Sequence, residues 1–168
     1  SAAVARPVAP RRVAITMNFN GMFALDREIR EICARMARRF EELGCIVEEA
    51  SPDFGPVDNV FMALRSQQFV VDRELQIQQH RDKIKPDIIW NTELGLEQTA
   101  SRLAWAERER AALYRRMGAF FQTYDLFVTP GAPTAAFDVN LRAPATIAGK
   151  KLENYMSGST LNSAITVT

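Results

Sequence analysis

RVAITMNF, residues 12–19, opens the segment that decides the fold of this chain. Large apolar side chains alternate with small or polar ones, which predicts a strand with one face against a core. A helix is expected next, because apolar residues recur at spacings of three and four until Gly44; they are Leu25, Ile29, Ile32, Met36, Phe40 and Leu43. CIVEEASP, residues 45–52, then resumes as a strand. This order predicts a crossover unit and an α/β fold.

Two further helices are expected after the crossover unit. The first begins at Val57 and is stopped or kinked by Pro86; its inward residues are Val60, Phe61, Leu64, Val71 and Leu75. The second covers Glu93 to about Tyr124, with Leu96, Leu103, Leu113, Met117 and Phe120 facing inward. It leads into YDLFVTPGAP, residues 124–133, which reads as a buried strand followed by a turn that two prolines make rigid.

The last part of the chain, residues 134–168, carries few regular signals apart from the apolar piece AITVT. The whole pattern predicts an α/β fold with a mixed β-sheet flanked by long helices. Residues 1–11 are expected to form an N-terminal tail or linker, and residues 12–168 a single α/β domain.

Composition excludes several classes of function. The chain has 168 residues, is 47% hydrophobic, and carries 21 basic against 20 acidic residues, a net charge of +1. No global field therefore attracts nucleic acid or an anionic membrane, and we expect neither as a partner. Cys33 and Cys45 are too few for a disulfide framework and lie in no metal-ligand spacing. With no bilayer-length apolar run and no signal peptide pattern, a cytoplasmic protein is predicted.

Few residues in this chain can carry catalysis. His80 is the only histidine and lies in a polar helical stretch, so it is read as a solvated residue. Neither GxxxxGK[ST] nor GxGxxG occurs, and no cofactor or metal is expected. Ser157 and Ser159 in YMSGST superficially suggest a nucleophile. Because no base is placed to activate them, we read them as loop or helix-cap residues and expect no catalytic residue in the chain.

Three segments together resemble the amidase signature family. DREIREICARMARRFEELGCIVEEASPDF, residues 26–54, is similar to a long charged helix and strand of those enzymes. IIWNTELGLEQTASRLAWAERERAALYRRMGAFFQTYDLFVTPGAP, residues 88–133, is the more specific match. It places family-like residues at Gly95, Arg108 or Arg110, Leu113, Phe120, Phe121, Tyr124, Asp125, Thr129, Pro130 and Pro133. LENYMSGSTLNSAITVT, residues 152–168, is similar to the segment that precedes a closing Gly-x-Pro strand in the family.

The resemblance implies amide-bond hydrolysis or glutamine-dependent amide transfer, on part of the amidase-signature fold. Family members use a serine nucleophile activated by a second serine in a cis peptide and by a lysine, with backbone amides stabilising the oxyanion. Those elements lie N-terminal to the matched segments in the family. We therefore expect this chain to be the C-terminal fragment of an amidase, inactive by itself, whose full-length parent takes a small-molecule amide substrate.

Within this reading, substrate-binding residues are expected where the strand after Asp125 ends. The candidates are Thr129, Pro130, Gly131, Tyr155 and Ser159. A turn that merely leaves the sheet is the alternative. A second hypothesis treats the chain as a non-catalytic α/β module for ligand or protein binding. A sheet that lacks its neighbouring strands should also expose apolar edges, so self-association into a homo-oligomer through these surfaces is predicted.

Overall fold

The computed structural model describes residues 2–6 and 8–168, so Ser1 and Pro7 of the expected tail lie outside the described residues. The chain divides into two compact units. One consists of Ser1–Asp53 and Arg116–Asn162, and the other of Phe54–Arg115 and Ser163–Thr168. In the expected tail, Ala2–Ala5 forms a short helix, α1. The expectation of a single domain over residues 12–168 stays a prediction.

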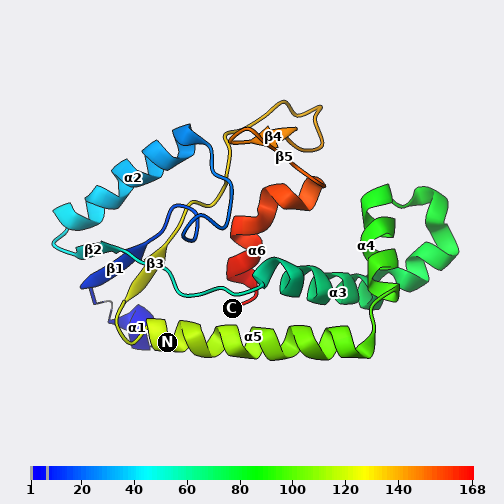
Figure 1. The fold of residues 1–168 in the computed structure, drawn as a ribbon, viewed down its shortest axis with the longest axis horizontal. Coiled ribbons are helices and arrows are strands. Elements are labelled where there is room, and N and C mark those ends of the chain that lie inside the picture. The colour runs from blue at the N-terminus through cyan, green and yellow to red at the C-terminus, as the bar shows by residue number, and fades with distance from the viewer. Residues whose placement is uncertain (1, 7) are drawn as a thin grey trace. The chain divides into compact units, whose positions relative to one another are not determined.

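The first unit is built on a three-stranded parallel sheet (Figure 1). Its strands are β1 (Arg12–Ile15), β2 (Ile46–Glu49) and β3 (Leu126–Val128), in the order β2-β1-β3. In the parallel registers, Val13 lies opposite Val47 on one side and Leu126 on the other. The predicted crossover unit is confirmed, because α2 (Arg27–Glu42) connects β1 to its parallel neighbour β2.

The α/β class is confirmed, but the single mixed sheet is replaced by two sheets. The three-stranded sheet is entirely parallel, and an antiparallel pair, β4 (Thr146–Ile147) with β5 (Lys150–Lys151), forms a separate ribbon. A turn with positive φ at Ala148 and Gly149 joins β4 to β5. The two strands that this turn joins are too short for a period-2 pattern to appear, so the sequence does not predict the ribbon.

The central strand β1 carries the core of the first unit. Val13 and Ala14 are fully buried although they point to opposite faces, so both faces of β1 are covered and the predicted single buried face is wrong. Just after it, Phe19 packs edge-to-face on Phe23 and Phe127, with ring centroids 5.2 and 5.9 Å away. Phe127 also meets Phe120 edge-to-face at 5.4 Å. These rings join the loop after β1, strand β3 and the helix end at Phe120 into one apolar cluster.

Helix α2 shows a correction to the expected inward face. Half-buried positions follow the stripe Ile29, Cys33, Ala37 and Phe40, and burial raises the pKa of the Cys33 thiol. Ile32, Met36 and Leu43, also predicted inward, are 40%, 60% and 78% exposed. The apolar arc of this helix is wider than the stripe that the rest of the unit covers.

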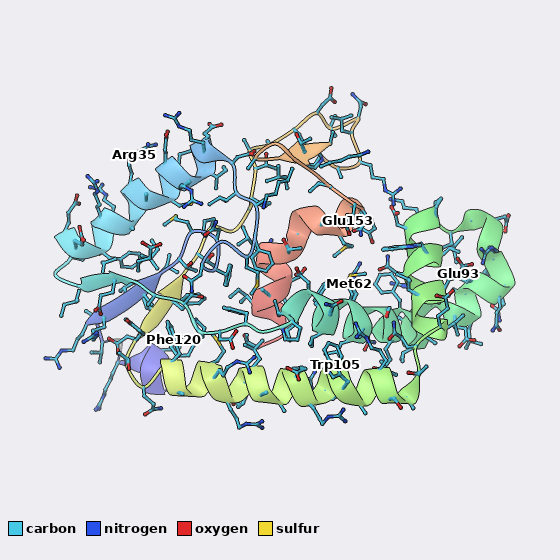
Figure 2. The ribbon with its side chains drawn as sticks, viewed as in Figure 1. Arg35, Met62, Glu93, Trp105, Phe120 and Glu153 are labelled. Carbon is cyan, nitrogen blue, oxygen red and sulfur yellow. The ribbon has the colours of Figure 1, made fainter. Side chains whose placement is uncertain are left out.

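The charged side of α2 is a solvated face. Arg35 points away from the sheet (Figure 2), and Arg27 pairs with Glu31 at 2.7 Å on the surface. The two edge strands also expose apolar side chains, Ile46 on β2 and Leu126 on β3. The expected apolar exposure at the sheet edges is therefore observed, while self-association stays a prediction.

Asp125, the residue directly before β3 in YDLFVTP, is tied by hydrogen bonds to the start of β1. Its Oδ2 accepts hydrogen bonds from the backbone N–H groups of Arg11, at 2.7 Å, and Arg12, at 2.9 Å. The Asp125 N–H in turn donates to the Arg12 carbonyl at 2.9 Å. The backbone N–H of Arg12, then that of Arg11, holds the pKa of this carboxyl below its usual value. Asp125 thus sets the start of β3 against the start of β1.

Asp125→Asn is expected to remove a pH-dependent part of the stability. Because the folded pKa is lowered, the wild-type carboxylate stabilises the fold above its unfolded pKa of about 3.9, and this contribution disappears as pH falls through the folded pKa. Urea unfolding at pH 7 should therefore show a less stable variant, and the gap should close in strong acid. Equal stability of the two proteins at neutral pH would contradict this role.

The second unit contains the long helix α3 (Val57–His80), a 3₁₀ turn, η1 (Arg81–Lys83), and α4 (Pro86–Leu96). Pro86 stands at the first turn of α4, so the predicted stop is confirmed, with a new helix starting at the proline itself. Val71 and Leu75 were predicted inward and are 74% and 70% exposed. They lie in the later half of α3, where few apolar residues share a face.

The prediction of one long helix over Glu93–Tyr124 is wrong in one respect, because two helices cover this range. α4 ends at Leu96, and α5 runs from Ala100 to Phe120. The break has a local cause: the hydroxyl of Thr99 accepts a hydrogen bond from the Arg102 N–H at 3.1 Å, which caps a new helix start. Leu96, predicted inward, is exposed at this break.

Gly95 allows α4 to approach α3 closely. A Cβ atom at this position would lie 2.1 Å from the backbone oxygen of Ser66 and 2.5 Å from a methyl group of Val70. The neighbouring polar residues Asn91 and Thr92 are buried on the same helix. They donate to the carbonyls of Asp87 and Ile88, one turn earlier, at 2.6 and 2.8 Å. The Asn91 amide nitrogen and the Thr92 hydroxyl thus bond back to the preceding turn of α4.

None of the helices in the described residues combines the length and the apolar content that a membrane span needs.

Candidate functional site

A hollow of about 450 Å³ lies in the first unit, along the loop that leaves the carboxyl end of β3. This is where ligands bind in many parallel α/β sheets. Three segments line it: residues 131–137, residues 142–144, and the stretch from Tyr155 to Asn162. Most of the lining is alanine, proline and aromatic, and its polar members are Thr134, Arg142, Ser159 and Asn162. Such a surface suits an organic molecule with an apolar body.

The hollow brings together three of the five predicted binding residues. Gly131, Tyr155 and Ser159 all line it. Thr129 and Pro130 precede the lining segment in the chain and do not line the hollow. Pro130 is buried, and the Oγ1 atom of Thr129 is buried with no hydrogen-bond partner among the described residues.

The segment with Tyr155 and Ser159 forms the 3₁₀ helix η2 (Tyr155–Ser159), followed by α6 (Thr160–Thr166). Asn154 caps η2, because its Oδ1 accepts from the N–H groups of Met156, at 2.8 Å, and Ser157, at 3.2 Å. The Arg142 guanidinium lies 5.1 Å from the centroid of the Tyr155 ring, within cation–π range. This contact joins the loop after residue 137 to the helical wall of the hollow.

Asp26 organises the hollow, although the sequence analysis did not single it out. One carboxylate oxygen accepts from the Thr134 hydroxyl at 2.5 Å, and the other from the Ala148 N–H at 2.6 Å. The Asp26 N–H donates to the Pro133 carbonyl at 2.9 Å. A single residue at the start of α2 thus ties the loop after β3 to the β4–β5 turn. The sequence signal was the aspartate directly before the helix, a position that we read only as part of a charged face.

The lining of the hollow offers polar groups for binding but no base for catalysis. No lysine or histidine lines it, so Ser159 has no such base beside it among the lining residues. Lys150 and Lys151 are exposed on β5, and His80 is exposed at the end of α3, as the solvated reading predicted. Within residues 2–6 and 8–168, no three His, Cys, Asp or Glu side chains gather closely enough to hold a metal ion.

Comparison with known proteins identifies the relatives of this chain. It is 24% identical over 147 residues to an acylamidase from Rhodococcus erythropolis, a match that covers 86% of this chain and 31% of that protein. The structure of a bacterial aryl acylamidase of the amidase signature enzymes superposes with a TM-score of 0.76 at 20% identity, over 99% of this chain and 36% of the other. The chain is a relative of the amidase signature enzymes. No protein-family model matches it.

A second solved amidase extends the agreement in fold. It superposes with a TM-score of 0.81 at 19% identity and covers 95% of this chain. The α/β architecture therefore matches part of the amidase signature fold, as the three sequence segments implied. The chain spans about a third of the length of these relatives, 31% of the acylamidase and 36% of each solved chain.

Proposed function

We propose that this chain is part of an amidase signature hydrolase that cleaves carboxamide C–N bonds. In this proposal the hollow beside β3 is one wall of the substrate pocket. The observation that carries it is the convergence of Gly131, Tyr155 and Ser159 on one apolar hollow at the carboxyl end of a parallel strand. The similarity to acylamidases supports the reaction class.

The role proposed for these residues is to bind and orient the substrate. The loop from Thr129 to Pro133 contains two prolines, and its end is tied down by Asp26, so little conformational entropy is lost when a ligand binds there. Tyr155 offers a flat apolar face, and Ser159 and Asn162 offer hydrogen bonds to an amide group. The nucleophile and its base come from a segment outside the 168 residues.

The proposal predicts that the 168-residue chain does not turn over an aryl amide such as 4-nitroacetanilide. The protein translated from the whole reading frame should hydrolyse it to acetate and 4-nitroaniline, with water as the acceptor of the acyl group. Turnover by the short chain would refute the proposed inactivity. Absence of amide hydrolysis from the longer protein, tested over a panel of acyl groups, would refute the amidase assignment and favour a non-catalytic binding module.

In the longer protein, Tyr155→Ala is expected to raise KM about tenfold, with a smaller change in kcat, because it removes apolar contact made equally in the ground and transition states. Tyr114→Ala is the matched control, since Tyr114 is 70% exposed on α5 and does not line this hollow. An unchanged KM for the Tyr155 variant would show that the hollow is not part of the substrate pocket.

A further inference from the structure

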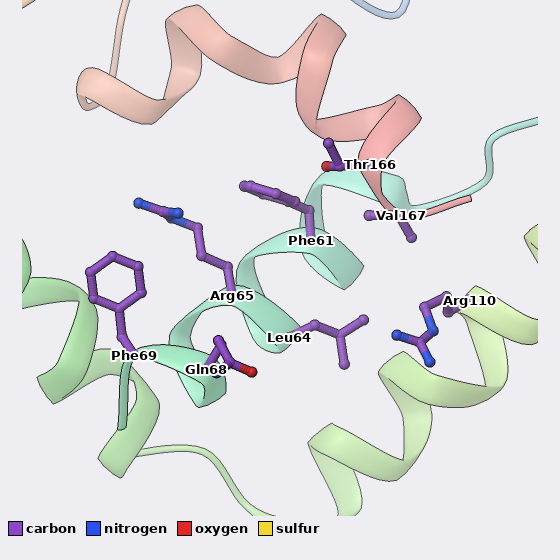
Figure 3. Close-up of a pocket in the computed structure, with 8 residues that line it drawn as sticks. All are labelled: Phe61, Leu64, Arg65, Gln68, Phe69, Arg110, Thr166 and Val167. Atoms are coloured by element: carbon purple, nitrogen blue, oxygen red, sulfur yellow. The ribbon is translucent and has the colours of Figure 1, made fainter. Parts of the chain in front are cut away.

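The second unit contains a separate hollow of about 310 Å³, to which the proposed amide chemistry assigns no role. Figure 3 shows its lining: side chains from α3, Arg110 from α5, Thr166 at the end of α6, and Val167 directly after it. Phe61, Leu64 and Val167 supply apolar surface, and Arg65 and Arg110 supply two guanidinium groups. No aspartate or glutamate belongs to the lining. The lining itself therefore combines apolar surface with two guanidinium groups, of which that of Arg110 also pairs with Glu107 outside the lining.

Arg65 is held by two aromatic rings of its own helix. Phe61, Arg65 and Phe69 follow one another at intervals of four residues, which puts them on one face of α3. The Arg65 guanidinium carbon lies 4.5 Å from the centroid of the Phe69 ring and 5.9 Å from that of Phe61. Its Nε atom is buried from solvent. Stacking of this kind fixes the plane of the guanidinium before any ligand arrives.

Arg110 supplies a second positive charge from another helix. Its guanidinium is held by Glu107, one turn earlier on α5, at 3.1 Å. Leu64 projects from α3 on the side of the hollow that faces α5 (Figure 3). Figure 3 shows the Arg65 guanidinium turned toward Phe69 and Arg110 beside Leu64, so an anionic group bound at Arg65 would meet that guanidinium first, and Arg110 would stand on the side of the hollow that faces α5.

We infer that this hollow binds a small organic carboxylate with an apolar aryl or alkyl body. A planar guanidinium presents paired donors that match the two oxygens of a carboxylate, and an aromatic face behind it keeps that geometry. The volume stands at the lower end of about 300–1,000 Å³ for small-molecule sites, which suits a ligand of the size of phenylacetate. The inference does not rest on the proposed amide hydrolysis, because it needs no residue of the first unit.

The test titrates small organic ligands into the 168-residue chain. Binding is measured by calorimetry and from the Arg Nε–H signals in nuclear magnetic resonance. Phenylacetate and hexanoate, which share the carboxylate but differ in the body, are compared with neutral phenylacetamide and with acetate. Saturable binding of phenylacetate or hexanoate at least about tenfold tighter than that of both phenylacetamide and acetate is expected. Equal binding of the amide would overturn the role of charge, and equal binding of acetate would overturn the role of the apolar walls.

Variants locate the site. Arg65→Gln and Arg110→Gln are each expected to weaken carboxylate binding by about tenfold. Arg73→Gln on α3 and Arg108→Gln on α5 are matched controls, because both arginines are exposed and line no part of this hollow. Phe69→Leu keeps an apolar side chain but removes the stacking ring, so it should weaken binding while helix content stays unchanged. Loss of affinity in the controls, or full affinity in both lining variants, would refute the assignment.

Discussion

Gly95→Ala is expected to lower the free energy of unfolding of the unit that contains α3 and α4 by at least about 3 kcal/mol. The added methyl group would meet the backbone oxygen of Ser66 at 2.1 Å and a Val70 methyl at 2.5 Å. A flexible side chain can turn away, but the Ser66 carbonyl is part of α3 and cannot move unless the helix moves. Urea unfolding followed by circular dichroism measures the effect.

Gly118→Ala is the matched control for this substitution. Gly118 is also a helical glycine, and a Cβ at its position would meet nothing within 4 Å. Alanine is a better helix former than glycine, so this variant should be more stable by about 0.5–1 kcal/mol. A lower free energy of unfolding in the Gly95 variant, together with a higher one in the Gly118 variant, would establish steric contact as the cause. A Gly95 variant as stable as the natural chain would mean that α4 does not pack on α3 as described.

Asp26→Ala is expected to loosen the hollow beside β3 and to destabilise the first unit by about 2 kcal/mol, since two hydrogen bonds to a charged carboxylate are lost. The Thr134 hydroxyl and the Ala148 N–H would both lose their acceptor. Amide hydrogen exchange at Ala148 should become about tenfold faster, because the turn between β4 and β5 opens more easily. Urea unfolding gives the stability, and exchange at this amide reports the local opening.

Asp138→Ala serves as the control for the aspartate substitution. Asp138 is exposed, and its carboxylate accepts only from the neighbouring Asn140 among the hydrogen bonds seen for it in the described residues. Its removal should leave exchange at Ala148 unchanged. Asp26→Asn keeps an acceptor oxygen and should fall between the natural chain and the alanine variant. If Ala148 exchanges at the same rate in all of these proteins, Asp26 does not hold the hollow together.

The crossover unit was predictable because its signals are local. Alternation in β1, the three-and-four spacing in α2 and Gly44 at its end all act over a few residues. The broken helix near Glu97–Thr99 was less predictable, since one hydroxyl cap outweighed an otherwise helical pattern. The wrong inward positions on α2 arose because an apolar residue is buried only where another part of the chain covers it, and only a narrow stripe of this helix is covered.

The candidate site was predictable only in part. Gly131, Tyr155 and Ser159 were reached through the strand end and the resemblance to amidases, and the structure brings them to one hollow. Asp26 stands 108 residues from Thr134 in the chain, so no spacing rule connects the two. The face shared by Phe61, Arg65 and Phe69 follows from a four-residue spacing, whereas the hollow that it lines also needs Arg110 and Val167, which are distant in the chain.

The sequence by itself determined the α/β class, the parallel crossover and the relation to amidase signature enzymes, because propensity, periodicity and motif are properties of neighbouring residues. Tertiary structure alone decided the strand order β2-β1-β3, the close approach at Gly95 and the hydrogen bonds of Asp26. Each of these depends on atoms that are distant in the chain and meet only when the backbone packs. The free energy of such contacts belongs to the pair of partners, so neither segment reveals it alone.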